Sequence, residues 1–212
     1  MPSHRASETI ASIVVSPTAV SPTTFRCTAC GNCCRSLRVA VTALDVARLS
    51  AASSASPSSL VAWLAPGEVD MTGEPDSFVE LSQGRRLMVL AQRDGACQLL
   101  DSDQRCRAYA SRPRDCRTFP FAFESIAPRS TGSRRLTLLP LNDCAYESDG
   151  HNDPNLLDAE DQVRWKELRD YQALVARWNR RAWHRRRLHR TVGDAAAFLS
   201  YALAAHSSIS CS

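Results

Sequence analysis

Four cysteines lie within eight residues, in the run Cys27-Thr-Ala-Cys30-Gly-Asn-Cys33-Cys34. Such short loops, together with two adjacent cysteines, leave little freedom for the geometry of ordinary disulfides. Four more cysteines follow with eight, nine and 27 residues between successive members, at Cys97, Cys106, Cys116 and Cys144. Clustered thiols in a reducing compartment usually bind metal. We therefore expect the chain to fold around a cysteine-ligated metal centre.

All eight of these thiols are candidate ligands. Two residues between cysteines let a tight turn present both sulfurs to one metal, and Gly31 relaxes the backbone where the loop must curl. The neighbours Cys33 and Cys34 project differently, so the pair is not expected to serve one tetrahedral ion. Either two four-thiolate sites or one polynuclear cluster plus a second site follows. The alternative is that these cysteines are buried or redox-labile thiols that act as small apolar side chains. The predicted ligands are Cys27, Cys30, Cys33, Cys34, Cys97, Cys106, Cys116 and Cys144.

The spacing limits the identity of the metal to an iron–sulfur cluster or zinc. Cys27, Cys30 and Cys33 have the spacing that opens a bacterial ferredoxin-type motif, although the Cys-Pro expected after three further residues is absent. A zinc ribbon would use a second close cysteine pair, and the sequence has none. These two observations slightly favour iron–sulfur over zinc.

Length and composition favour one globular domain with tails. The chain has 212 residues, of which 44% are hydrophobic and 23% charged. Its nine cysteines make up about 4% of the residues, well below the content of about 8–10% that is typical of small disulfide scaffolds. No apolar run approaches the roughly 20 residues of a membrane-spanning helix, and no secretory apolar region of about 7–15 residues is evident. We expect a soluble, cytoplasmic protein without membrane association.

The predicted organisation has three parts. Residues 1–24, rich in Ser, Thr, Pro and Ala, form a flexible tail, residues 25–150 form the metal-binding domain, and residues 151–206 form a helical segment packed on it. Apolar residues recur along this last segment at helical spacing, at Leu168, Tyr171, Val175, Trp178 and Ala182. A break near residues 191–194 precedes a shorter helix to Ala205.

Local patterns before residue 150 predict short helices and hairpins. Thr42 and Asp45 form a capping-box pattern ahead of a short helix, and Ser56-Pro57 predicts a second helix ending near Leu64. Two pairs of apolar runs predict hairpins, at residues 78–92 and at residues 119–126 with 134–141. The expected fold class is α+β, with small hairpins and helices packed around the metal centre and helices at the C-terminus.

The cysteines lie in two longer motifs, Phe25-x-Cys27-x-x-Cys30-Gly31-x-Cys33-Cys34 and, after Cys97, Cys106-x-x-Tyr109-x-x-Arg112-Pro113-x-x-Cys116-Arg117-x-Phe119-Pro120. Together these motifs resemble a known family, the YkgJ-like CxxCxxCC cysteine-cluster proteins. The resemblance implies a bacterial metal-binding protein that chelates zinc or iron. Ala110 departs from the pattern, since the family often has an acid after the tyrosine. Longer relatives, the flagellin lysine N-methylases, carry a similar cluster and are linked to iron–sulfur-dependent methyl transfer.

Three residues of the second motif have predicted supporting roles. Arg112 and Arg117 are expected to hydrogen-bond near thiolate sulfur or to neutralise the charge of the site, with surface salt bridging as the alternative. Tyr109 is expected to shield the site by packing.

Conventional catalysis lacks sequence support. None of the eight glycines forms a Gly-x-Gly loop, and no nucleophile motif or pair of catalytic carboxylates is evident, so no catalytic residue is assigned. We expect metal binding or electron handling, with a metal ion and an unidentified protein or redox partner. One alternative is an iron–sulfur-dependent redox or methyl-transfer enzyme resembling flagellin lysine N-methylase.

A second alternative is nucleic-acid binding by a basic helix. Between residues 177 and 190 the chain has seven arginines and no acid, accompanied by two tryptophans and two histidines. We favour a solvated helix face over an anion or partner surface here, because the apolar arc of the helix already includes Trp178. The arginines are Arg177, Arg180, Arg181, Arg185, Arg186, Arg187 and Arg190.

Overall fold

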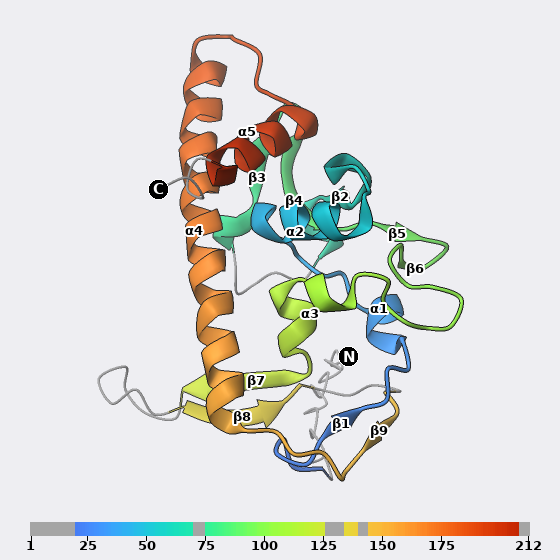
Figure 1. The fold of residues 1–212 in the computed structure, drawn as a ribbon. Coiled ribbons are helices and arrows are strands. Elements are labelled where there is room, and N and C mark those ends of the chain that lie inside the picture. Colours follow the sequence, from blue (N-terminus) through green and yellow to red (C-terminus); the bar gives the residue numbers. More distant parts are fainter. Residues whose placement is uncertain (1–19, 70–74, 126–133, 140–143, 208–212) are drawn as a thin grey trace, which may run out of the picture.

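A computed structural model describes residues 20–69, 75–125, 134–139 and 144–207 (Figure 1). Its elements confirm the α+β class. The helices of these residues are α1 (Asn32–Ser36), α2 (Ala43–Ser53), α3 (Arg114–Thr118), α4 (Pro154–Arg187) and α5 (Ala195–Ser207). The strands are β1 (Arg26–Cys27), β2 (Val61–Leu64), β3 (Val79–Leu81), β4 (Gly84–Leu90), β5 (Gln92–Arg93), β6 (Ala96–Cys97), β7 (Phe121–Ser125), β8 (Arg134–Leu138) and β9 (Tyr146–Glu147). Single 3₁₀ turns cover Pro57–Ser59, Pro66–Glu68, Pro75–Ser77 and Tyr109–Ser111.

The strands form small antiparallel sheets. The largest has three strands in the order β2-β4-β3, and two-stranded ribbons join β5 to β6 and β7 to β8. The short pair of β1 and β9 brings Cys27 opposite Tyr146, although the two strands are far apart in the sequence. This pairing places the start of the cysteine motif next to the segment that follows Cys144.

Helix α4 runs along one side of the molecule and connects its two ends (Figure 1). Near its start it contacts α3 and β7, and further along it packs against β3. The apolar spacing predicted for this helix is confirmed, since Tyr171, Val175 and Ala182 are buried. Trp178 is half-buried and donates a 2.8 Å hydrogen bond from Nε1 to the carbonyl oxygen of Glu80.

The main apolar core lies between α2, α4, α5 and the three-stranded sheet. Its fully buried side chains include Leu49, Leu60, Met88 and Phe198. The ring of Phe198 contacts Trp63, Tyr171 and Trp178 edge to face, with centroid separations of 5.3 to 6.4 Å. Three of the candidate ligands, Cys97, Cys106 and Cys116, pack against the border of this core. The core therefore supports one wall of the cysteine region.

Several local predictions are confirmed. Thr42 caps α2 in a reciprocal capping box with Asp45, and the hairpin predicted at residues 78–92 is formed by β3 and β4. In the other predicted hairpin β7 pairs with β8, while residues 126–133, 140 and 141 lie outside the described residues. Helix α5 begins after Asp194, whose carboxylate accepts from the Ala197 amide.

The prediction of a helix from Pro57 to Leu64 is wrong. Only the 3₁₀ turn Pro57–Ser59 forms, and Val61–Leu64 is strand β2, paired with β4 in the register Val61 to Leu90. Tertiary pairing with a long apolar strand outweighs the local helix start signal here, because a four-residue run has little helical preference of its own.

Residues 1–19 of the predicted tail lie outside the described residues, whereas residues 20–24 pack on the domain. Val20 is buried, and the Asn152 side chain donates to the carbonyl oxygens of Pro22 and Phe25.

Candidate metal centre

One large cavity is lined by all eight candidate thiols. Its volume is about 890 Å³, and its walls come from β1, α1, β6, α3, the segment around Cys106 and the residues before β9. The outermost of these cysteines, Cys27 and Cys144, are more than one hundred residues apart in the chain, and each of the eight is a free thiol. The fold thus gathers the predicted ligands around a common space.

Cys30 and Cys144 are in direct contact. Their sulfurs are 3.6 Å apart, which is far longer than the about 2.05 Å of a disulfide. Two thiolates bound to one tetrahedral metal with bonds of about 2.3 Å are separated by about 3.8 Å. The spacing of this pair therefore suits two ligands of one metal.

The hydrogen bond between the two sulfurs favours the thiolate form of Cys30 and the thiol form of Cys144. Burial opposes ionisation of Cys30, but hydrogen bonds from the Asn32 backbone and the Cys144 side chain lower the pKa of Cys30. Burial, followed by the same hydrogen bond, raises the pKa of Cys144 to about 12. The negative charge of Cys27 contributes to the raised pKa of Cys144, so these three thiols form one electrostatic group.

A second group of thiols surrounds α1, β6 and α3. A hydrogen bond from the Cys34 side chain lowers the pKa of Cys33 to about 6, and the same contact raises the pKa of Cys34. Burial raises the pKa of Cys116, and the charge of Cys97 raises it further. Burial also raises the pKa of Cys97, where Cys106 adds its charge. Cys33 interacts with members of both groups.

The donor set fits a thiolate-bound metal in its chemistry. Eight soft sulfur donors on one cavity are the ligands that zinc and iron–sulfur clusters take. Within the residues that the structure describes, no three His, Cys, Asp or Glu side chains already stand in a closed arrangement for an ion. The sulfurs line the wall of the cavity, and metal binding would draw them together and displace the protons that they now share.

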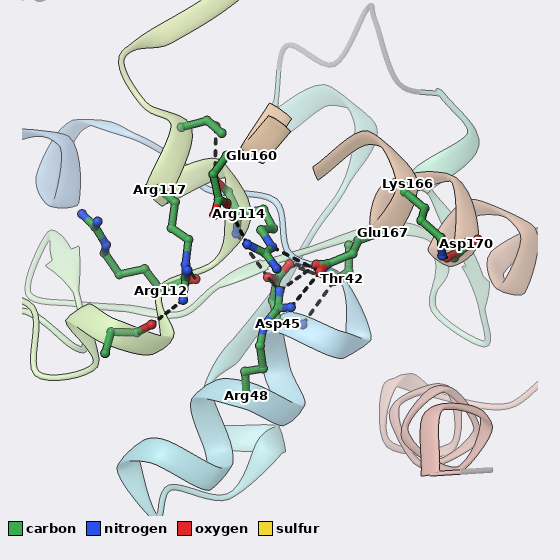
Figure 2. A network of polar contacts seen from close by, with 12 residues as sticks. Thr42, Asp45, Arg48, Arg112, Arg114, Arg117, Glu160, Lys166, Glu167 and Asp170 are labelled. Carbon is green, nitrogen blue, oxygen red and sulfur yellow. Dashed lines mark hydrogen bonds and ion pairs between the residues drawn. The ribbon is translucent and has the colours of Figure 1, made fainter. Parts of the chain in front are cut away.

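The three predicted supporting residues differ in their contacts. The Arg112 guanidinium lies 3.7 Å from the centre of the Tyr109 ring, and its charge helps to lower the pKa of Cys33. Tyr109 is 59% exposed and lines the cavity, with its ring against Arg112. Arg117 donates to the backbone oxygens of Arg112 and Ala110 and thereby fixes the loop between Cys106 and Cys116 (Figure 2).

Helix α3, which carries Cys116, is held in place by ion pairs. Arg114 on α3 contacts Glu160 at 2.7 Å and Glu167 at 3.1 Å, both on α4 (Figure 2). Glu167 also pairs with Arg48 of α2 at 2.8 Å. These contacts join three helices next to the cavity and set the position of Cys116.

Charged and apolar residues that no sequence motif indicated complete the cavity wall. Asp115 pairs with Arg164 at 3.1 Å, and both residues line the cavity. Burial raises the pKa of Asp115 although Arg164 opposes this effect. Phe121 and Trp165 supply apolar wall, and Phe121 meets Phe25 edge to face at 5.7 Å. The position of Asp115 beside a candidate ligand was the only local signal for any of them.

Comparison with protein families identifies the type of domain. The family model CxxCxxCC, described as a putative zinc- or iron-chelating domain, matches residues 26–142, which is more than half of the chain. The chain belongs to the CxxCxxCC family. This confirms the resemblance that the cysteine motifs indicated, and the description of the family supports metal binding.

No curated protein and no solved structure matches the chain. Membership of the CxxCxxCC family is therefore shown by the family model, and the cavity lined by the eight cysteines is described from this structure. In the described part of the chain, none of the helices combines the length and the apolar character needed to cross a membrane.

Proposed function

We propose that the protein chelates zinc or iron through the eight cysteines of the cavity and that this is its primary function. The observation that carries the proposal is that all eight thiols of the motif line one cavity. Random burial of cysteines as small apolar residues would not collect them from five separate stretches of the chain around a common space. The ligands proposed are Cys27, Cys30, Cys33, Cys34, Cys97, Cys106, Cys116 and Cys144.

Within this proposal we prefer an iron–sulfur cluster to a zinc ion. The spacing of Cys27, Cys30 and Cys33 is that of a ferredoxin-type motif. The division into a Cys30–Cys144 group and a group around Cys33 agrees with two sites, either two four-thiolate sites or one polynuclear cluster and a second site. An iron–sulfur cluster would supply one-electron transfer when bound, and the cysteine thiolates would hold it.

Anaerobic purification followed by elemental analysis, sulfide determination and a visible spectrum tests the proposal. We expect iron with acid-labile sulfide and a broad visible absorption that bleaches on reduction, because thiolate-bound clusters absorb in this way and zinc does not.

Two results would contradict the proposal at different levels. A colourless protein with stoichiometric zinc and no sulfide would overturn the preference for iron–sulfur but keep the ligand set. A protein without bound metal after anaerobic handling would overturn metal chelation itself and return the cysteines to redox or packing roles.

The cavity favours a second candidate, an iron–sulfur-dependent redox or methyl-transfer enzyme. Its volume of about 890 Å³ is in the range of small-molecule sites, about 300–1,000 Å³, and its walls include Phe25, Phe121 and Trp165. A change in the visible spectrum on adding small aromatic or aliphatic compounds would support this candidate.

We further propose a cytoplasmic location, where thiols stay reduced. We also propose that residues 25–150 form the metal-binding domain and that residues 151–206 form a helical segment built onto it.

A further inference from the structure

The last turns of α4 carry a row of exposed cations far from the cysteines in sequence. Arg177, Arg180, His184 and Arg187 follow one another at intervals of three or four residues, so they share one helix face. All four are exposed. At a rise of about 1.5 Å per residue the row is about 15 Å long.

This row lacks the acidic partners of an ordinary solvated face. Earlier in α4, Arg164 pairs with Asp161 and Lys166 pairs with Asp170. Residues 171–193 contain no Asp or Glu at all. In the described part of the chain, neither Arg177 nor Arg180 forms an ion pair, and Arg187 lies over an aromatic ring instead.

An exposed aromatic ring borders the row. Trp183 is 58% exposed, and the Arg187 guanidinium lies 4.8 Å from the centre of its ring. Because Trp178 and Tyr171 face the core, Trp183 is the tryptophan of this region that is open to a partner. A free ring face beside a line of cations suits stacking of a base next to bound phosphates.

A membrane surface fits this arrangement less well. A helix that binds in the membrane interface buries a broad apolar face in the lipid. The apolar face of α4, with Leu174, Val175 and Ala182, is already buried in the protein core. Only Trp183 and Leu188 remain as exposed large apolar side chains at this end of the helix.

We propose that this face of α4 binds single-stranded nucleic acid, with phosphates along Arg177, Arg180 and Arg187 and a base on Trp183. A row of about 15 Å is long enough to contact several successive phosphates of a single strand. The proposal is independent of the metal centre. It favours the alternative that the sequence alone left in second place, because the structure aligns these cations and shows the open ring.

Fluorescence anisotropy with a labelled single-stranded RNA of about 16 nucleotides tests the proposal between about 50 and 200 mM salt. The triple variant Arg177→Gln/Arg180→Gln/Arg187→Gln should reduce the slope of log K against log salt by about 2, since each phosphate contact on a single strand contributes about 0.7. The matched control removes three exposed arginines elsewhere, as Arg93→Gln/Arg135→Gln/Arg169→Gln, and should leave the slope unchanged.

A second variant separates stacking from charge. Trp183→Ala should weaken binding about tenfold or more without changing the salt slope, because stacking contributes little to ion release. Absence of salt-dependent RNA binding would overturn the proposal, as would an equal loss in both triple variants, which would indicate net charge alone. Tighter binding to phosphatidylserine vesicles or to polyglutamate than to RNA, with Trp183→Ala silent, would also overturn it and indicate a membrane or an acidic protein as the partner.

Discussion

Adjacent cysteines at Cys33 and Cys34 show how a single residue pair can belong to two groups of thiols. Both belong to α1, where successive side chains diverge by about 100° around the helix. Both line the cavity, yet Cys33 also interacts with Cys30 and Cys144, while Cys34 interacts with Cys97 and Cys116. A short helix at this point therefore lets one segment contribute to both sides of the cavity.

The first prediction concerns individual ligands. Cys30→Ser and Cys116→Ser should each lower the metal content and destabilise the fold by several kcal/mol, because a lost ligand removes free energy of metal binding that is coupled to folding. Elemental analysis and thermal unfolding measure the two effects. Cys211→Ser is the matched control, since Cys211 lies outside both motifs and outside the described residues, and it should change neither quantity. Equal effects from the three variants would contradict the separate roles assigned to these cysteines.

The second prediction concerns Glu167, which joins Arg48 and Arg114. Burial raises the pKa of Glu167, but the hydrogen bond and charge of Arg48 outweigh it, so the pKa of this carboxyl lies below its usual value. A lowered pKa in the folded state stabilises the protein above the unfolded-state pKa of about 4.3, and this contribution is lost as the pH falls through the folded-state pKa.

Glu167→Gln should therefore lower the free energy of unfolding by about 2–3 kcal/mol at about pH 7. Breaking a fully buried pair costs about 3–5 kcal/mol, and the loss expected here is smaller because both arginines are partly exposed. The difference from the wild type should shrink as the pH falls below about 4.3. Urea unfolding at several pH values measures it. Lys166→Gln, which removes an exposed ion pair, should change stability by at most about 0.5 kcal/mol. A loss in Glu167→Gln that is the same at every pH would contradict the ion-pair explanation.

At the scale of elements, close packing of the α4–α5 connection against α4 gives the third prediction. A Cβ added at Gly193 would lie 2.7 Å from the Trp178 ring, which is held by its hydrogen bond to Glu80. Gly193→Ala should destabilise the protein by about 1–3 kcal/mol through overpacking. Gly67→Ala is the control, because a Cβ at Gly67 meets nothing within 4 Å. Thermal unfolding that shows equal changes in both variants would contradict the packing argument.

The elements also show which parts of the fold the sequence could predict. The capping box of Thr42 and Asp45 and the long apolar spacing of α4 are local patterns, and both were interpreted correctly. Strand β2 was predicted as helix, because its partner β4 begins twenty residues after β2 ends and no local signal reports that pairing. The same reason applies to the site. The motifs predicted which cysteines belong to the site. The approach of Cys30 to Cys144 and of Asp115 to Arg164 depends on contacts between residues distant in sequence, which no motif reports.

At the scale of the whole molecule, stability comes from two regions of different chemistry. One is the apolar core of α2, α4, α5 and the three-stranded sheet, which buries Leu49, Met88 and Phe198. The other is the cysteine region, whose short segments α1, α3 and β6 have two to five residues each. Elements of this length hold few backbone hydrogen bonds and little apolar area, so they need another source of stability. Bound metal is the source that their thiols offer.

The fourth prediction follows from this division. A metal that binds the folded state alone stabilises it by about 2.7 kcal/mol at one hundred times its Kd, and removal of the metal withdraws that energy where the ligands lie. After removal of the metal with a chelator, hydrogen exchange should accelerate in residues 25–36, 96–118 and 144–150. Residues 43–53 and 171–182 should exchange at nearly their original rate, because their apolar contacts do not depend on the thiols. Mass spectrometry of peptides before and after chelation measures the difference. Uniform acceleration along the chain would show that the metal supports the core directly, and no change anywhere would show that the cysteine region is stable without it.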